Sequence, residues 1–132
     1  MALWISRAGS HGEHEKRFLE EGRIYLTWDG LKYELSNYST KKALRKLLQE
    51  VYGYSGSRLS NYCGQVWAFY QKMKVGDWVV LPSKLKRAVH IAEIMGNYIF
   101  DDAADDPYYH YRKVKWIATD IPRSNFDQDL LY

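Results

Sequence analysis

The sequence predicts a single α+β domain in which a small, strongly bent antiparallel sheet, or an open barrel, is flanked by helices. The chain has 132 residues, which is enough for one domain and short for two. Apolar residues make up 46% of it and charged residues 27%, a balance that is typical of a folded globular chain. Strand patterns lie before and after two central helix patterns, and this order predicts the α+β class.

The first third of the chain predicts a strand, a short helix and a second strand. Residues 2–7 form a short apolar segment that precedes a polar turn. Residues 13–21 are mostly charged and predict an exposed helix that ends at Gly22, because glycine readily adopts the left-handed conformation that closes a helix. Residues 23–28 alternate in polarity and contain β-branched and aromatic side chains, as strands do. Residues 31–37 fit neither pattern.

Two longer helices are predicted in the middle of the chain. Thr40 is a suitable N-cap for residues 41–52, whose apolar side chains recur on one face. The rest of that helix surface carries basic residues, namely Lys41, Lys42, Arg45 and Lys46. In residues 58–73 apolar and aromatic side chains recur at spacings of three and four, so this segment predicts a helix with a long apolar stripe.

The last third of the chain predicts a strand meander. Residues 78–81 form a short apolar run that a proline ends, and residues 89–94 continue with β-branched side chains. Residues 98–100 extend the meander, and residues 109–117 predict one more long strand. The tail allows a last turn over residues 125–131.

The charge of the chain is distributed unevenly along it. Residues 1–87 contain 15 Lys and Arg against 8 Asp and Glu, which gives +7, whereas residues 88–132 contain 4 against 8, which gives −4. The two parts recover the formal net charge of +3. A basic majority with an acidic minority indicates an anionic partner approached from one side, or else a solvated surface that is merely asymmetric.

The sequence lacks the residues that several common kinds of catalytic and metal site require. Cys63 is the single cysteine, so no internal disulfide and no zinc cluster is expected, and a reducing, cytoplasmic setting is the default. No glycine-rich phosphate loop and no metal-nuclease motif is present, and no apolar run is long enough to span a membrane. We therefore predict no catalytic residue, no metal, no cofactor and no membrane partner.

Aromatic residues are abundant, at 21 of 132, and suit a ligand cage as well as a core. Several motifs stand out in order along the chain. They are residues 4–9 (WISRAG), Trp28, 61–65 (NYCGQ), 74–83 (KVGDWVVLPS), 94–98 (IMGNY), 111–116 (YRKVKW), 121–124 (IPRS) and 129–132 (DLLY). In this order they resemble the N-terminal domain of Mrr-like bacterial restriction proteins, which is similar to the EVE and YTH members of the PUA-like superfamily.

The resemblance implies a PUA-like barrel that reads a modified base in double-stranded DNA, usually by flipping it into an aromatic pocket. Family members carry a nuclease domain after this module. Residues 1–132 are therefore expected to be one nucleic-acid-binding domain excised from a longer modification-dependent restriction endonuclease. On this interpretation the domain is a reader and not itself an enzyme.

Eight residues are candidates for the base pocket, because they place rings, small residues or amides at strand and helix ends. They are Ser6, Arg7, Ala8, Gly9, Trp28, Asn61, Gln65 and Tyr98. Asn61 and Gln65 are one helical turn apart, and each amide can pair with a base edge through a donor and an acceptor. Each candidate also has a structural alternative, such as packing for Trp28 and helix capping for Asn61.

Six residues are candidates for phosphate contacts, with a plain solvated surface as the alternative. They are Ser83, Lys84, Lys86, Arg87, Arg112 and Arg123. Two other functions stay open: an RNA-binding PUA-like module, and a small ASCH-like nucleoside hydrolase. The hydrolase would need a Lys or an acid with a shifted pKa inside the pocket, and the sequence names no clear candidate.

Overall fold

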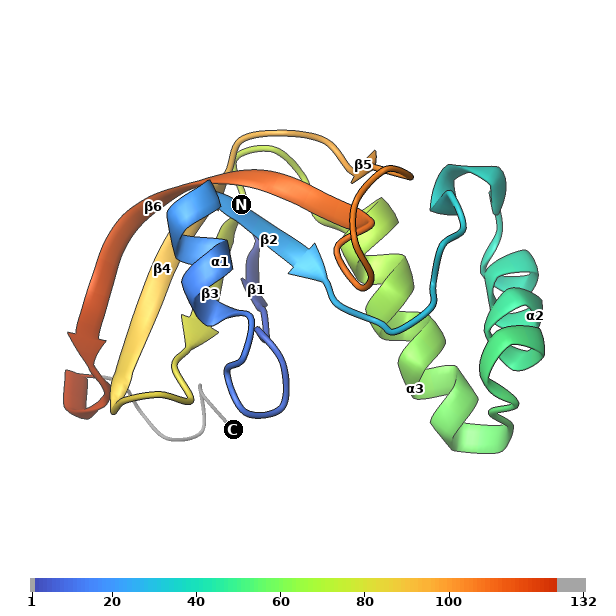
Figure 1. Cartoon of the computed structure of the whole chain (residues 1–132), viewed down its shortest axis with the longest axis horizontal. Helices are drawn as coiled ribbons and strands as arrows, with labels where there is room; N and C mark the ends of the chain where they lie inside the picture. The colour runs from blue at the N-terminus through green and yellow to red at the C-terminus, as the bar shows by residue number, and fades with distance from the viewer. Residues whose placement is uncertain (1, 126–132) are drawn as a thin grey trace.

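A mixed sheet, curled into an open half-barrel, forms one side of the protein in the computed structural model, which describes residues 2–125 (Figure 1). The strands are β1 (Leu3–Ile5), β2 (Arg23–Leu26), β3 (Trp78–Pro82), β4 (Ala88–Ile94), β5 (Ile99–Phe100) and β6 (His110–Pro122). Their order in the sheet is β1-β3-β4-β6-β2, and β5 pairs with β6 beside this path. The predicted α+β class is confirmed.

The expectation of a wholly antiparallel sheet is wrong at one edge. Strand β1 pairs with β3 in parallel, with Leu3 opposite Trp78, whereas the other pairs are antiparallel. The chain between β1 and β3 contains every α-helix of residues 2–125 and is long enough for the crossover that parallel pairing requires. A three-residue strand carries no local signal for its direction, so the sequence could not indicate this pairing.

Strand β6 curls the sheet because it pairs with β2 and with β4 at different points along its length. Its first residues pair with β2, where Tyr25 lies opposite Tyr111, and the remainder pairs with β4, where Ile94 lies opposite Val114. Register shifts near Ile91 interrupt the β4–β6 ladder, and such bulges increase the local bend and twist of a strand. The long, curved β6 therefore carries the sheet around from β4 to β2 (Figure 1).

The helices follow the sequence patterns closely. They are α1 (Glu15–Glu21), α2 (Lys41–Tyr52) and α3 (Gly56–Trp67), with short 3-10 turns η1 (Leu35–Asn37) and η3 (Arg123–Asn125). Gly22 ends α1 at φ 63°, and the Thr40 hydroxyl accepts a hydrogen bond from the Ala43 N–H at 3.1 Å, so both predicted caps are confirmed. Helix α3 ends earlier than predicted, because a π-helical turn, η2 (Ala68–Lys72), continues it.

Helices α2 and α3 form a hairpin that stands beside the sheet (Figure 1). We call residues 38–74 the helical lobe. Both helices bury their apolar stripes, through Leu44, Leu47 and Leu48 on α2 and through Leu59, Cys63 and Val66 on α3. These side chains belong to the same buried cluster as the sheet residues, so the lobe shares one core with the half-barrel.

A buried polar contact fixes the loop between β1 and α1. The Glu15 carboxylate lies 3.0 Å from His90 Nε2, with both side chains almost fully buried, and it accepts a hydrogen bond from the Lys84 N–H at 3.2 Å. The contact ties the start of α1 to β4 and to the turn between β3 and β4. It thereby holds the preceding loop in place, and that loop forms part of the site described below.

Two further observations complete the fold. No helix within residues 2–125 is long and apolar enough to cross a membrane. The last turn predicted over residues 125–131 lies, beyond its first residue, outside the described part of the chain.

Candidate functional site

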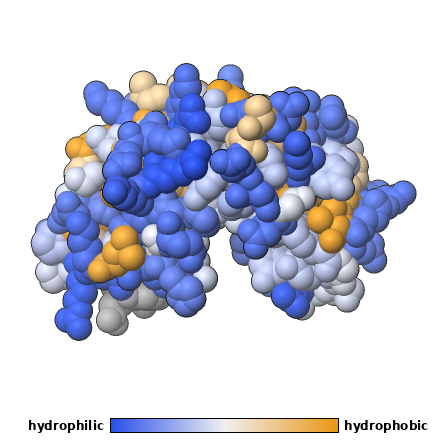
Figure 2. All heavy atoms as spheres, in the orientation of Figure 1, coloured by the Kyte–Doolittle hydropathy of each residue, from blue (hydrophilic) through white to orange (hydrophobic). Residues whose placement is uncertain are grey.

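A cleft of about 990 Å³ lies between the helical lobe and the two edge strands of the half-barrel, β1 and β2. Figure 2 shows the surface hollowed between these two parts of the molecule. The lining comes from four segments of the chain: Trp4, Ile5, Ser6, Arg7, Gly9 and Ser10; Tyr25, Leu26, Thr27 and Trp28; Asn61, Tyr62, Gly64, Gln65, Ala68 and Phe69; and Met73. Ligand sites commonly occupy about 300–1,000 Å³, so this cleft has room for more than a single small group.

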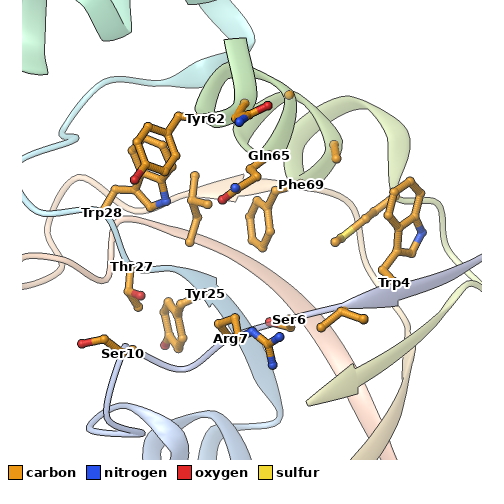
Figure 3. A pocket seen from close by; sticks show the side chains of 17 residues that line it. Trp4, Ser6, Arg7, Ser10, Tyr25, Thr27, Trp28, Tyr62, Gln65 and Phe69 are labelled. Carbon is orange, nitrogen blue, oxygen red and sulfur yellow. The ribbon is translucent and has the colours of Figure 1, made fainter. Parts of the chain in front are cut away.

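The aromatic side chains of the cleft stand on different walls (Figure 3). Phe69 extends from the helix side together with Gln65, and Tyr25 lies across from them on β2. Trp28 and Tyr62 close one end of the cleft, whereas Trp4 stands at the other. A flat ligand that enters the cleft therefore meets rings from several directions.

Trp28 belongs to a small aromatic cluster at its end of the cleft. Its ring packs edge-on against Tyr62, with ring centroids 5.2 Å apart, and against Tyr52 at 5.6 Å. The Tyr52 hydroxyl donates a hydrogen bond to the Asp29 carbonyl at 2.7 Å, and burial raises the pKa of that hydroxyl, so it remains a neutral donor. These contacts hold the indole in one orientation while one side of it borders the cleft.

Trp4 is held at the opposite end by Asp77. The Trp4 Nε1–H donates to one carboxylate oxygen at 2.9 Å, and the backbone N–H groups of Ala2 and Lys74 donate to the same carboxylate at 3.0 Å each. The hydrogen bonds from Ala2, Trp4 and Lys74 lower the pKa of Asp77 to about 2. The carboxylate is thus ionised at neutral pH and fixes the indole ring.

Polar groups with unused hydrogen-bonding capacity face the cleft from α3. Asn61 and Gln65 are exposed, and within residues 2–125 neither side-chain amide has a hydrogen-bond partner. On the opposite wall the chain leaves β1 at Ser6, whose N–H donates to the Val80 carbonyl at 2.9 Å. Gly9 follows at φ 89°, a left-handed conformation that a side chain would strain, so the loop turns back close to the cleft.

The lining is nearly free of charge. Among the described residues that line the cleft, Arg7 is the one charged side chain, and none is Asp, Glu, His, Lys or Cys. Nowhere within residues 2–125 do three or more His, Cys, Asp or Glu side chains gather to hold a metal ion. The cleft can stack and hydrogen-bond a neutral ligand, but its lining offers no general base for chemistry on it.

The structure brings six of the eight predicted pocket residues together in the cleft: Ser6, Arg7, Gly9, Trp28, Asn61 and Gln65. Ala8 does not line it, because its side chain is buried in the core and its carbonyl accepts from the His14 N–H at 3.0 Å. Tyr98 does not line it either. It borders a separate, smaller cavity of about 440 Å³ together with Arg112.

Tyr98 instead takes part in a chain of buried hydrogen bonds, which we call the relay. The Leu35 N–H donates to its hydroxyl at 3.1 Å, and the hydroxyl donates to His110 Nδ1 at 2.6 Å. His110 Nε2–H in turn donates to the Leu31 carbonyl at 2.6 Å. Burial lowers the pKa of His110 to about 4, so the ring is neutral and its single proton sits on Nε2. The relay joins the loop before α2 to β6.

The prediction that Arg112 contacts phosphate is wrong. Its side chain is 2% exposed. Its guanidinium donates to three backbone carbonyls: Gly96 at 2.9 Å, Phe69 at 3.1 Å and Met73 at 2.9 Å. The residue fastens the end of η2 to β6, which a sequence motif rich in Lys and Arg does not reveal.

Three of the other phosphate candidates make side-chain contacts within the protein, and the remaining two are exposed. Ser83 is 2% exposed, and its hydroxyl accepts from the N–H groups of Leu85 and Lys86, so it braces its own turn rather than facing a ligand. Lys86 forms an ion pair with Asp120, and Arg123 donates to the Ser83 carbonyl at 3.3 Å. Lys84 and Arg87 are exposed, so their predicted role stays open.

Sequence reasoning missed four aromatic residues of the cleft: Trp4, Tyr25, Tyr62 and Phe69. Tyr62 and Phe69 follow the helical spacing of the apolar stripe, so the pattern assigns them to the core. Phe69, at 5% exposure, does belong to the buried cluster, and it borders the cleft as well. The width of the apolar stripe on α3 was the available signal. The stripe is wide because part of it packs against α2 and another part borders the cleft. Nothing local to Trp4 indicated that Asp77, far along the chain, would orient it.

Comparison with known proteins yields one relationship. A protein family described as a domain of unknown function, DUF8426, matches residues 4–129. No curated protein and no solved structure shows significant similarity to the chain. The match includes every segment that lines the cleft and nearly the whole chain. The chain therefore belongs to the DUF8426 family.

Proposed function

We propose that this domain reads a modified base in double-stranded DNA, and that it binds the base, flipped out of the duplex, in the cleft between α3 and strands β1 and β2. The observation that carries the proposal is the lining of that cleft. Trp4, Tyr25, Trp28, Tyr62 and Phe69 supply rings, and two amides without intramolecular partners stand among them. A nucleobase presents a flat π-face and a hydrogen-bonding edge, and this lining complements both.

The energetics of flipping are compatible with this lining. Extruding a base costs a few kcal/mol, and stacking on an aromatic side chain returns about 1–3 kcal/mol per base. Rings on two sides would therefore roughly balance the extrusion. A methyl group adds only about 0.8 kcal/mol when buried, so selectivity for it requires a rigid cage. The fixed orientations of Trp28 and Trp4 support such rigidity.

The absence of acidic side chains among the described lining residues narrows the class of base that the cleft suits. A base that carries a formal positive charge after methylation would call for a carboxylate, and among the described lining residues there is none. Asn61 and Gln65 can each donate to and accept from the edge of a neutral base. We therefore favour an uncharged modification, such as a methyl or hydroxymethyl group on cytosine or a methyl group on adenine.

Binding is favoured over hydrolysis by the same lining. A nucleoside hydrolase needs an acid or base positioned beside the scissile bond. Hydroxyls of Ser6, Ser10 and Thr27 are present in the cleft, but no histidine and no carboxylate is among the described residues that line it with them. A half-barrel with a helix beside its opening also suits a PUA-like reader, which would direct a fused nuclease domain to modified DNA in the cytoplasm.

A binding panel tests the proposal. One duplex sequence is prepared unmodified and with 5-methylcytosine, 5-hydroxymethylcytosine or N6-methyladenine at one site, and affinities are measured by fluorescence anisotropy at one salt concentration. We expect one modified duplex to bind at least tenfold more tightly than the unmodified one. Equal affinity for all duplexes would contradict the reader function, and tighter binding of an RNA of the same sequence would replace DNA by RNA as the target.

A further inference from the structure

The helical lobe concentrates the positive charge of the protein. Residues 38–74 contain seven Lys and Arg and one acidic residue, Glu50, which gives +6. Since the whole chain carries +3, the remaining residues together carry −3. The lobe is thus strongly cationic, whereas the rest of the chain has the opposite sign.

Four of these cations share one side of α2. Lys41, Lys42, Arg45 and Lys46 follow one another at spacings of one, three and one, which places them within an arc of about 140° on an α-helix. The apolar residues of α2 point into the core, and the three lysines are exposed. This side of the helix is therefore a continuous basic surface.

The charges of this surface are not neutralised within residues 2–125. Among residues 2–125, the ion pairs Lys16–Glu20, Arg17–Glu21 and Lys86–Asp120 lie outside the lobe, and none involves a lysine or arginine of this surface. Lys41 and Lys42 also stand in the first turn of α2, where the helix dipole disfavours positive charge, and no acidic residue offsets them. Such an arrangement does not stabilise the folded chain by itself, and it is suited to an anionic partner.

The basic surface reaches the cleft through α3. Arg45 Nη1 donates to the Ser60 hydroxyl at 2.6 Å. Ser60 is the residue before Asn61, which lines the cleft. Arg58 adds a cation over Tyr54, with 4.4 Å from its guanidinium carbon to the ring centroid, and lies 5.7 Å from the ring of Tyr62, another lining residue. A polymer bound on the lobe can therefore place a flipped base in the cleft.

We propose that this basic surface, made of Lys41, Lys42, Arg45, Lys46 and Arg58, binds the phosphate backbone of the duplex whose base enters the cleft. The inference rests on the proposed function and extends it. The four cations of α2 span about 7.5 Å of helix axis, with a mean spacing of about 2.5 Å. Double-stranded DNA carries one charge per about 1.7 Å of axis, so several phosphates of the duplex lie along this span.

Two triple variants with equal loss of charge test this surface. The first is Lys41→Gln, Lys42→Gln and Lys46→Gln on the lobe, and the matched control is Lys16→Gln, Lys113→Gln and Lys115→Gln on α1 and β6. All six lysines are exposed, so both proteins should stay folded, as checked by circular dichroism. Affinities for the unmodified and the modified duplex are measured between 0.05 and 0.3 M salt.

We expect the lobe variant to bind both duplexes more weakly by the same factor, roughly 8-fold for each lysine at 0.1 M salt. The slope of log K against log salt should become shallower by about 2.7, whereas the control should change it by less than 1. Equal effects of the two variants, an unchanged slope, or tighter binding of single-stranded RNA than of the duplex would overturn the proposal.

The same data separate the two claims. If the lobe variant loses affinity as expected but the wild type does not distinguish the duplexes, the basic surface stands and the reader function fails. If the wild type prefers a modified duplex and the lobe variant matches its control, the reader function stands and the surface fails. Absence of duplex binding by the wild type would overturn both.

Discussion

At the scale of single residues, Trp28 is the side chain whose removal should separate base recognition from general DNA affinity. Its ring can stack on a base only after the base has left the duplex. Trp28→Ala should therefore remove about 1–3 kcal/mol from the flipped complex, which corresponds to a 5- to 150-fold loss of preference for the modified duplex. Phosphate contacts remain, so binding to unmodified DNA should change little. Anisotropy titrations with the two duplexes measure both quantities.

Trp67→Ala is the matched control for that substitution. Trp67 is also half-buried and packs edge-on against another ring, that of Tyr70 at 5.9 Å, but it does not line the cleft. Both variants should lose a similar amount of thermal stability, whereas the control should retain the preference for the modified duplex. A folded Trp28→Ala protein that keeps the full preference would show that Trp28 is not a wall of the base site.

His110 gives the protein a defined dependence of stability on pH. Its pKa is lowered from 6.5 to about 4 by burial, so the folded state excludes a proton that the unfolded chain binds below about pH 6.5. The neutral ring therefore supports the fold fully above pH 6.5, and this support is lost as the pH falls toward 4. The loss should approach about 3 kcal/mol.

Urea unfolding between pH 7 and pH 4.5 measures this loss, and NMR titration of the His110 ring protons identifies its source. The ring signal should stay that of a neutral imidazole down to about pH 5. A titration midpoint near 6.5 would show that His110 is not the buried neutral acceptor of the Tyr98 hydroxyl.

At the scale of elements, Arg112 links η2 to β6 through three backbone carbonyls. Arg112→Lys keeps the charge but cannot reproduce the fork of donors, and a buried carbonyl left unpaired costs about 1–3 kcal/mol. The free energy of unfolding should therefore fall by about 2–4 kcal/mol, whereas the salt dependence of DNA binding should not change. A stable variant with a shallower salt slope would instead restore Arg112 as a phosphate ligand.

The helices could be predicted from sequence because their signals are local. The Thr40 cap, the Gly22 termination and the periodic stripes of α2 and α3 all act within a few residues. The parallel β1–β3 pair and the π-helical turn could not be predicted, because both depend on what the chain meets elsewhere. Arg112 shows the same limit, since a motif cannot indicate that a basic side chain is buried.

At the scale of the whole molecule, the cleft exists because two separately predictable parts meet. Strand ends and loop residues such as Ser6 and Trp28 come from the half-barrel, whereas Asn61 and Gln65 come from the helical lobe. Six of the eight candidates that the sequence places at element ends lie in the cleft. The periodicity of Tyr62 and Phe69 predicts core packing, which is confirmed for Phe69, but it does not indicate that both rings also border a cleft.

The most direct test of the central claim, that a modified base occupies this cleft, uses the indole N–H signals of the five tryptophans in a two-dimensional NMR spectrum. Trp4 and Trp28 line the cleft, whereas Trp67, Trp78 and Trp116 do not, and Trp116 is held by a hydrogen bond to the Phe18 carbonyl. Addition of the preferred modified duplex should shift the Trp4 and Trp28 signals strongly and leave those of Trp78 and Trp116 in place. Shifts confined to Trp78 and Trp116, with Trp4 and Trp28 unchanged, would contradict the account.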